Sequence, residues 1–353
     1  MKTIRISMIG YLPPPTGGVR VLFRQLTEEL RREQNVEIKV VSLTGKRRGL
    51  FWKTVSLCNG LARALYHCLK VDVVSLQPTN QALVAVGPLL HIVCRLLGKP
   101  LIIRKFGGSF HETFSNYPAP VRALLEATVF KADLWLLETR FLVNFFKDKC
   151  RNVAYYPNSR PSLPQPAPQS TRASRFVFLS HISRGKGVED LFNVSDRLPP
   201  ECRIDLYGPL GFDISQSRVE QLSRDHSASY KGMIPSERVQ EVLAGYDALI
   251  LPTRLQTEGY PGVILEAYTC GLPVVASDCG AIGEIVDRQS GLLVEPGNLL
   301  QLEQAILDIH TNTTLFQQLQ KGALDKGKQF DSRLWTAAFL RFCRELHETN
   351  TNQ

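Results

Sequence analysis

The chain has 353 residues, enough for two domains of ordinary size, and 44% of them are hydrophobic, which supports a core in each. The net charge of +9 is unevenly spread, since residues 1–165 carry 24 Lys and Arg against 10 Asp and Glu, whereas residues 166–353 carry 18 against 23. This asymmetry indicates that the first half faces a polyanion or an anionic membrane. The eight cysteines include no Cys-x-x-Cys, so neither a zinc site nor a redox motif is indicated, and a reduced cytoplasmic setting is expected.

The sequence predicts no membrane span. Its most apolar segment, 82–97, contains Gly, Pro, His and Arg, and it is shorter than the roughly 20 apolar residues that a spanning helix needs. A buried or interfacial helix is expected there instead. The chain starts Met-Lys-Thr-Ile-Arg and enters a strand pattern directly, so we expect no signal peptide.

Strand-like and helix-like segments alternate along the chain. In the first half a strand is expected at 4–9 and an amphipathic helix at 19–33, and further strands are expected at 36–43, 71–76, 101–104, 134–137 and 153–156. In the second half strands are expected at 176–179, 203–207, 228–231, 248–251 and 273–276, and helices at 263–270, 299–309, 315–329 and 334–346. This alternation predicts α/β structure with parallel sheets.

Two loops of the first half follow expected strands, where a doubly wound sheet binds its ligands. Gly17 and Gly18 stand between the first strand and the first helix, although a glycine pair by itself mostly marks a turn. No Gly-x-Gly-x-x-Gly follows the first strand, which argues against a dinucleotide-binding dehydrogenase. The second loop, 105–112, contains His111.

A linker and a basic loop open the second half. Four prolines between positions 161 and 168 predict an interdomain linker at 161–172. After the next strand, Arg184, Gly185, Lys186 and Gly187 lead into an expected helix. A cation in a glycine-bearing loop at a helix start predicts a phosphate site, with a plain basic loop as the alternative.

The most informative stretch is 247–298, where a buried strand, a polar loop, a short helix and a second buried strand follow one another. Glu258 precedes the helix and Glu266 lies within it, and the free N–H groups of a helix start suit phosphate. Gly259 and Gly262 let a ligand approach the backbone. Because carboxylates repel phosphate, hydrogen bonds to sugar hydroxyls are favoured for both glutamates. The alternative is an acid at a helix N-terminus and a solvated helix residue.

Several motifs in this stretch occur in a fixed order. They are the spacing Glu258-x7-Glu266, Glu258-Gly-Tyr-Pro-Gly262, Gly271-Leu-Pro-Val-Val-Ala-Ser277, Gly280-Ala-Ile-Gly-Glu-Ile-Val286 and Gly291-Leu-Leu-Val-Glu-Pro-Gly297. In these motifs the chain resembles glycosyltransferase family 4, strongly after residue 176 and more weakly before it. The resemblance implies a GT-B fold, in which two Rossmann-like doubly wound domains face a cleft and a C-terminal helix crosses back to the first domain. The implied bounds are 1–160, 161–172 for the linker, 173–330 and 331–353 for that helix.

The resemblance also implies roles for individual residues. Glu258 would contact the donor sugar, Glu266 the ribose and Lys186 the diphosphate, while His111 would lie near the reacting sugar. The other expected donor contacts are Gly17, Gly18, His181, Arg184, Gly208, Gly259, Tyr260, Pro261, Gly262 and Val263. Ser180-His181 replaces the family's usual Gly-Arg, which leaves open whether His181 or Arg184 supplies a second phosphate cation.

The implied activity is that of a retaining glycosyltransferase. It would move a hexose-type sugar from a nucleotide-sugar to a glycan or lipid-linked acceptor in surface polysaccharide biosynthesis. No Asp-x-Asp occurs, so we expect no metal, and no cofactor besides the nucleotide-sugar co-substrate. An epimerase-like enzyme of the same fold and a non-catalytic relative remain alternatives. Nucleic acid is not an expected partner, because the bases form no known reading motif.

The basic first half predicts a peripheral protein on the cytoplasmic face of a membrane. The segment Lys46-Arg-Arg-Gly-Leu-Phe-Trp-Lys53 interleaves bases with aromatic residues. An anionic leaflet attracts each base by roughly 1 kcal/mol, and aromatic rings favour the headgroup layer. A basic surface that handles an anionic soluble acceptor is the alternative.

Overall fold

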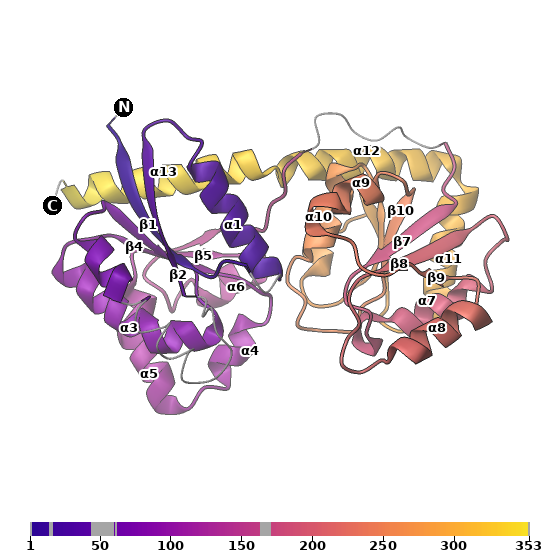
Figure 1. Ribbon diagram of the computed structural model, residues 1–353, viewed down its shortest axis with the longest axis horizontal. Helices are drawn as coiled ribbons and strands as arrows, with labels where there is room; N and C mark the ends of the chain where they lie inside the picture. Colours follow the sequence, from indigo (N-terminus) through magenta and orange to yellow (C-terminus); the bar gives the residue numbers. More distant parts are fainter. Residues whose placement is uncertain (1, 14–16, 44–59, 61, 163–170, 352–353) are drawn as a thin grey trace. The chain divides into compact units, whose positions relative to one another are not determined.

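The structure is a computed structural model that describes residues 2–13, 17–43, 60, 62–162 and 171–351. The chain forms two compact units, one of Met1–Pro157 with Ser332–Gln353 and the other of Asn158–Asp331. Each unit is a parallel sheet with helices on both faces, as Figure 1 shows. The predicted α/β class with two doubly wound domains is confirmed.

The sheet of the first unit has the strand order β2-β1-β3-β4-β5-β6, and all of its strand pairs are parallel. Its strands are β1 (Ile4–Gly10), β2 (Val36–Ser42), β3 (Val73–Leu76), β4 (Leu101–Lys105), β5 (Leu134–Leu137) and β6 (Val153–Tyr155). Its helices are α1 (Gly18–Leu30), α3 (Asn80–Leu96), α4 (Phe110–Ser115), α5 (Ala119–Ala127), η1 (Val129–Lys131), α6 (Arg140–Phe146) and α13 (Ser332–Thr351).

The sheet of the second unit has the order β12-β11-β10-β7-β8-β9, again with parallel pairs. Its strands are β7 (Arg175–Leu179), β8 (Arg203–Tyr207), β9 (Ser229–Tyr230), β10 (Ala248–Leu251), β11 (Val274–Ser277) and β12 (Gly291–Val294). Its helices are η2 (Arg184–Lys186), α7 (Val188–Ser195), α8 (Gln216–Asp225), η3 (Ser236–Arg238), α9 (Val239–Leu243), α10 (Gly262–Thr269), η4 (Ile282–Glu284), α11 (Leu299–Thr311) and α12 (Thr313–Gln329).

Two hydrophobic cores lie on the two faces of the first sheet. Successive residues of a strand point to opposite faces, so in β5 Trp135 and Leu137 enter the core beneath α3 to α6, whereas Leu134 and Leu136 enter the core beneath α1 and α13. Both faces are thus covered. This explains why a central strand such as β5 is one continuous apolar run, whereas β2 at the edge of the sheet alternates apolar and charged residues over its first four positions.

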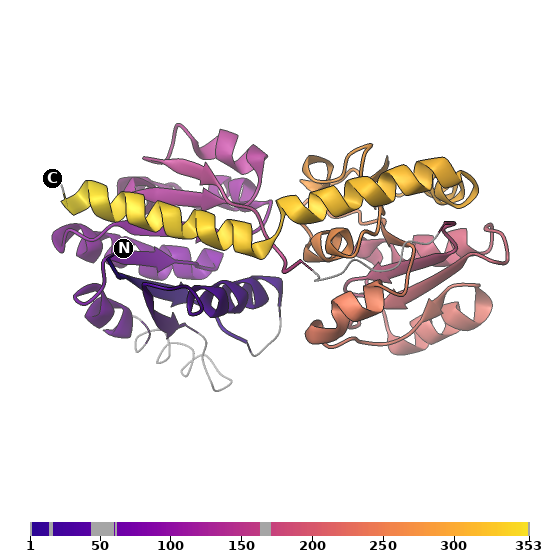
Figure 2. The same ribbon diagram turned by 90° about the horizontal axis from the view of Figure 1, so that it is seen from above.

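Helix α13 returns the chain to the first unit. Its buried residues Phe339, Leu340 and Cys343 join the core of α1 and β1, and the hydroxyl of Tyr156 donates to the carbonyl of Trp335 at 2.9 Å. Figures 1 and 2 show the helix running along this unit. The predicted C-terminal helix therefore packs on the first domain, and it extends from Ser332 to Thr351, beyond the expected range of 334–346.

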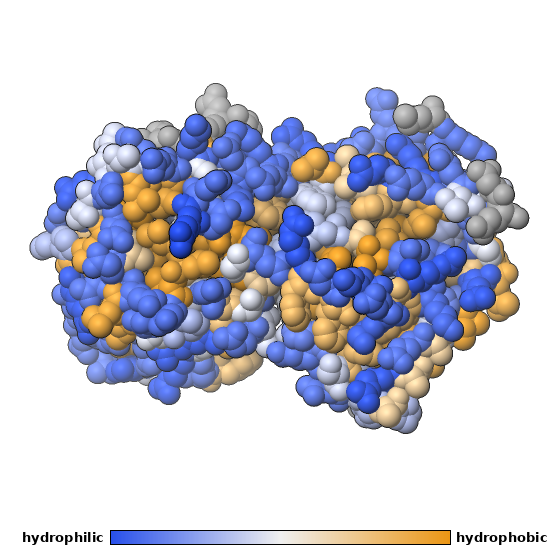
Figure 3. Space-filling view, turned by 180° about the vertical axis from the view of Figure 1, so that it is seen from behind, coloured by the Kyte–Doolittle hydropathy of each residue, from blue (hydrophilic) through white to orange (hydrophobic). Residues whose placement is uncertain are grey.

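None of the described helices is long and apolar enough to cross a membrane. Helix α3, expected from the apolar segment 82–97, buries Leu83, Leu90 and Cys94 but leaves Leu96 exposed. Figure 3 shows apolar areas bordered by hydrophilic residues on the viewed face of each unit. Folding of the units therefore leaves some apolar surface in contact with water.

Candidate functional site

The strand order of the second sheet marks a ligand position. The order reverses between β7 and β10, which lie side by side, so that chain connections leave in opposite directions from this point. In open α/β sheets the crevice outside the carboxyl ends of such strands binds ligands. Here β7 leads into the loop of Lys186 and β10 into the loop of Glu258.

The loop of Lys186 is fixed against the end of β10. Gly187 has φ +74°, and a Cβ there would lie 2.1 Å from the carbonyl oxygen of Pro252. The amide of Arg254 also donates to the carbonyl of Gly185 at 2.8 Å. Only glycine at position 187 permits this approach, which sets the backbone of Lys186 beside the Glu258 loop.

Lys186 and Glu258 meet in one ion pair. The ammonium of Lys186 donates to the carboxylate of Glu258, whose Oε1 also accepts a hydrogen bond from the Thr253 hydroxyl at 3.2 Å. The two charged side chains are 17% and 12% exposed, so the pair is shielded but reaches solvent. The structure thus brings together two of the three residues predicted to be catalytic.

The start of α10 adds backbone donors to this loop. Within the described residues, the amides of Gly262 and Val263 have no hydrogen-bond acceptor, as expected for the first turn of a helix. Gly259 and Pro261 precede them directly. The Tyr260 ring is buried and its hydroxyl donates to Glu284 at 2.7 Å, so any ligand contact of Tyr260 would come from its backbone.

Glu266 has a partner that the sequence did not indicate. The guanidinium of Arg160 donates to its carboxylate at 2.6 Å, and both side chains are largely buried. A Cβ at Gly262 would lie 2.0 Å from Nη2 of Arg160, so this glycine makes room for the arginine at the helix start. Arg160 was overlooked because it adjoins the linker. Its one sequence signal is its place directly after Pro157-Asn158-Ser159.

The two candidates for a second phosphate cation both lie in the β7 loop. His181 is exposed. The guanidinium of Arg184 lies 3.8 Å from the carboxylate of Glu189, so its recorded ion pair is with Glu189 and not with Glu258. Gly208 abuts the start of this loop, since a Cβ there would lie 1.8 Å from the Ser180 carbonyl oxygen. The choice between His181 and Arg184 stays a prediction, and so does a ligand contact of Gly208.

The first unit holds the remaining predicted residues. Gly17 and Gly18 begin α1, and a Cβ at either would meet nothing within 4 Å. His111 lies in α4, where its Nδ1 is 3.2 Å from the Gly108 carbonyl oxygen and its ring packs edge-on against Phe141. These three residues share the carboxyl side of the first sheet. They belong to a different unit from Lys186 and Glu258.

Sequence reasoning also missed a buried charged pair on the first sheet. Lys105 ends β4 and is buried beside Glu138, which follows β5 and accepts the Gly107 amide at 2.7 Å. Burial lowers the pKa of Lys105 to about 8, and the charge of Glu138 opposes this shift. Glu138 therefore holds the loop that leads to His111, through its hydrogen bond with the Gly107 amide.

The described residues contain no cluster of three or more His, Cys, Asp or Glu that could hold a metal ion, and their seven cysteines are unpaired. The interleaved basic and aromatic segment 46–53 lies outside the described residues. Metal independence and the membrane role of that segment stay predictions.

The fold is that of GT-B proteins. The whole chain superposes on sucrose-phosphate synthase from Thermosynechococcus elongatus with a TM-score of 0.71 at 16% identity, covering 98% of this chain and 100% of that one. It superposes on HepE of Anabaena, solved in complex with UDP and glucose, with a TM-score of 0.70 at 17% identity, covering 96% and 99%. At these identities the likeness shows the fold alone.

Residues 173–312 match the model of the family Glycosyl transferases group 1. This match spans less than half of the chain and includes both Lys186 and Glu258.

Curated relatives match less than half of the chain. The sulfoquinovosyl transferase of Arabidopsis thaliana is 26% identical over 173 residues, which are 48% of this chain and 32% of the relative. O-antigen chain mannosyltransferase B of Escherichia coli is 26% identical over 160 residues, 44% of this chain and 41% of the relative. The chain thus aligns with less than half the length of these relatives.

Proposed function

We propose that the protein transfers a hexose-type sugar from a nucleotide-sugar to a glycan or lipid-linked acceptor. The observation that carries this proposal is the Lys186–Glu258 pair beside the unbonded amides of α10, at the strand-order reversal of the domain that matches the group 1 glycosyltransferase family. Support for the donor comes from HepE of Anabaena, which was solved with UDP and glucose.

In this proposal the charges of the pair have separate tasks. Lys186 and the amides of Gly262 and Val263 stabilise the negative charge that develops on the departing diphosphate. Glu258 accepts hydrogen bonds from the sugar hydroxyls. When the donor binds, it would break the ion pair between Lys186 and Glu258. The diphosphate would then interact with Lys186, and the sugar hydroxyls would donate hydrogen bonds to Glu258.

The proposed chemistry is a front-face displacement with retention of configuration. The bond from the anomeric carbon to the diphosphate oxygen breaks, and the acceptor oxygen forms a bond to the same carbon. The acceptor proton passes to the departing phosphate oxygen. No metal is assigned, because the cation and the helix-start amides supply the charge stabilisation that a metal would provide elsewhere.

We further propose that the acceptor belongs to surface polysaccharide synthesis and that the protein acts at the cytoplasmic face of a membrane. The motivation is the excess of Lys and Arg in the first half, together with relatives such as the O-antigen chain mannosyltransferase. An anionic soluble acceptor is the competing possibility for the same charges.

The test is a panel of purified protein with UDP-, GDP- and ADP-sugars, each with and without a bacterial lipid and glycan extract. We expect nucleoside diphosphate release that requires both donor and extract, and a product whose anomeric configuration matches the donor by NMR. Lys186→Ala is the site control and Arg63→Gln, an exposed cation outside the site, is its matched control. Conversion of the donor without any acceptor would instead support an epimerase-like enzyme. An absence of turnover with every donor would refute the transferase proposal.

A further inference from the structure

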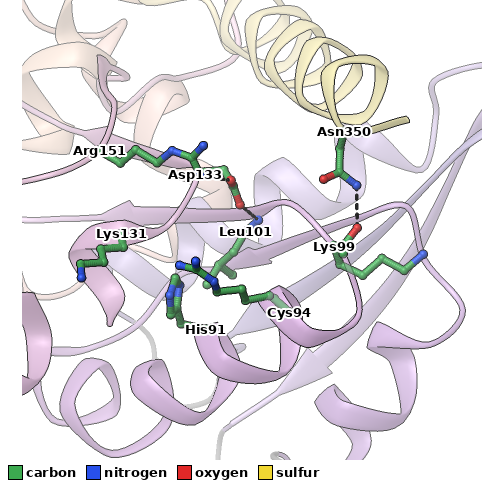
Figure 4. A pocket seen from close by; sticks show the side chains of 10 residues that line it. His91, Cys94, Lys99, Leu101, Lys131, Asp133, Arg151 and Asn350 are labelled. Carbon is green, nitrogen blue, oxygen red and sulfur yellow. Dashed lines mark hydrogen bonds and ion pairs between the residues drawn. The ribbon is translucent and has the colours of Figure 1, made fainter. Parts of the chain in front are cut away.

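A cavity lies in the first unit, at the edge of the sheet opposite to the loops that contain Gly17 and His111. This cavity of about 420 Å³ is lined by Leu101, the first residue of β4, and by Asp133, which directly precedes β5 (Figure 4). The predicted donor and acceptor loops of this unit follow the carboxyl ends of its strands. The cavity is therefore separate from the proposed transfer site.

The lining of the cavity is strongly basic. It includes Arg95, Lys99, Lys131 and Arg151 but only one carboxylate, that of Asp133. That carboxylate is already engaged, because it pairs with Arg151 at 3.1 Å and accepts the Leu101 amide at 2.9 Å. For the other three cations, no carboxylate lies within 4 Å in the part of the chain that the structure describes.

Interaction with the dipole of α3 explains only some of the basic residues that line the cavity. Arg95 and Lys99 stand at the C-terminal end of α3, where cations are favourable. The backbone amide of Lys99 also donates a hydrogen bond to the carbonyl of Cys94 at 2.8 Å, so this carbonyl at the helix end already has a partner. Lys131 ends the short helix η1 and Arg151 precedes β6, so these two cations reach the same cavity from two other segments and the dipole of α3 does not account for them.

A buried histidine also lines the cavity. His91 is 7% exposed, and among the described residues it has no hydrogen-bond partner. Burial lowers the pKa of its ring, so at neutral pH the imidazole is neutral and keeps one N–H donor. The ring of His91 borders the cavity, so a ligand there could accept a hydrogen bond from this N–H in place of water.

We propose that this cavity binds the phosphate group of a phosphorylated molecule, held by Arg95, Lys99 and Lys131 with a ring N–H of His91 as a further donor. Its volume is within the range of about 300–1,000 Å³ that is usual for small-molecule sites. Asn350 of α13 closes one side by donating to the Gly98 carbonyl. The source of the phosphate is a soluble metabolite or a lipid headgroup, and exposed Leu89, Ile92 and Leu96 on α3 make the lipid a realistic source.

The experiment measures binding by the full chain, without any sugar donor, of two probes. The soluble probe is inorganic pyrophosphate, followed by calorimetry. The lipid probe is a vesicle of phosphatidylcholine with or without phosphatidic acid, followed by cosedimentation. The variant is Arg95→Gln with Lys131→Gln, and both positions are exposed, so the fold should be unaffected. The matched control is Arg63→Gln with Lys147→Gln, which removes the same charge from exposed positions of the same unit outside the cavity.

We expect the cavity variant to lose at least about tenfold in affinity for one probe, because two charge-assisted hydrogen bonds are removed. The control should change by no more than a few-fold. Loss with pyrophosphate identifies a soluble ligand, and loss with vesicles alone identifies a lipid headgroup. Equal losses in variant and control, or no binding of either probe by the wild type, overturn the proposal. These binding measurements do not test sugar transfer, which is measured separately with the donor panel.

Discussion

Replacing Lys186 with Ala removes the only cation that the structure assigns to Glu258 within the described residues. The carboxylate would keep one hydrogen bond, from Thr253. Breaking a fully buried pair costs about 3–5 kcal/mol, but this pair reaches solvent, so we expect the free energy of unfolding to fall by about 1–2 kcal/mol. If Lys186 stabilises the departing diphosphate, turnover should fall by about 10²- to 10³-fold.

A double variant separates these two effects. Lys186→Ala with Glu258→Gln removes the unpaired carboxylate, so urea unfolding should show most of the lost stability restored while turnover stays low. Calorimetry adds a direct readout. The nucleoside diphosphate that the wild type binds best should bind Lys186→Ala at least about tenfold more weakly, whereas its nucleoside should bind equally. Wild-type turnover in the single variant, or an equal loss for nucleoside and diphosphate, would refute the assignment of Lys186 to phosphate.

Three further outcomes follow from the same site. Gly187→Ala should lower the free energy of unfolding in urea by about 1–3 kcal/mol, because its Cβ would meet the Pro252 carbonyl at positive φ, whereas Gly17→Ala, with open space around it, should change it little. Glu258→Gln should reduce turnover more than Glu266→Asp, and equal losses would contradict the separate sugar and ribose roles. Turnover should persist in EDTA, and loss with rescue by Mn²⁺ or Mg²⁺ would contradict a metal-free reaction.

The fold was predictable because its signals are local. Each strand of the two sheets except β12 was expected, and central strands such as β5 and β10 come from continuous apolar runs because both of their faces are buried. The run Gly291–Val294 is only partly buried and short, which made it indistinct. In α13, helical spacing places Leu334 on the same apolar stripe as Phe339 and Phe342, yet Leu334 is exposed, while Leu340 and Cys343 are buried. Periodicity gives a stripe, but the neighbouring elements decide which residues it includes.

The candidate site was less predictable because its partners are distant in sequence. Lys186 and Glu258 were each assigned from their own loops, yet nothing in either loop indicates that the two pair with each other across 72 residues. Arg160 lies 106 residues from Glu266, and its role depends on the absence of a side chain at Gly262. Such contacts depend on how the loops fold over the sheet, which no single segment encodes.

Lys105 supplies a pH-dependent prediction in the first unit. Its pKa is lowered by burial from 10.5 to about 8, so between these values the unfolded chain holds more protons than the folded one. Stability contributed by this group therefore rises with pH from about 8 upward, by about 2 kcal/mol between pH 7 and pH 10. The reference is Lys105→Met with Glu138→Gln, which removes the titrating lysine without leaving a buried carboxylate, and glutamine retains an acceptor for the Gly107 amide.

The measurement is urea unfolding of both proteins across this range, since other lysines and tyrosines titrate alike in each and cancel in the difference. We expect the wild type to gain stability relative to the double variant as the pH rises. Parallel curves from pH 7 to pH 10 would mean that Lys105 keeps an ordinary pKa and is not desolvated.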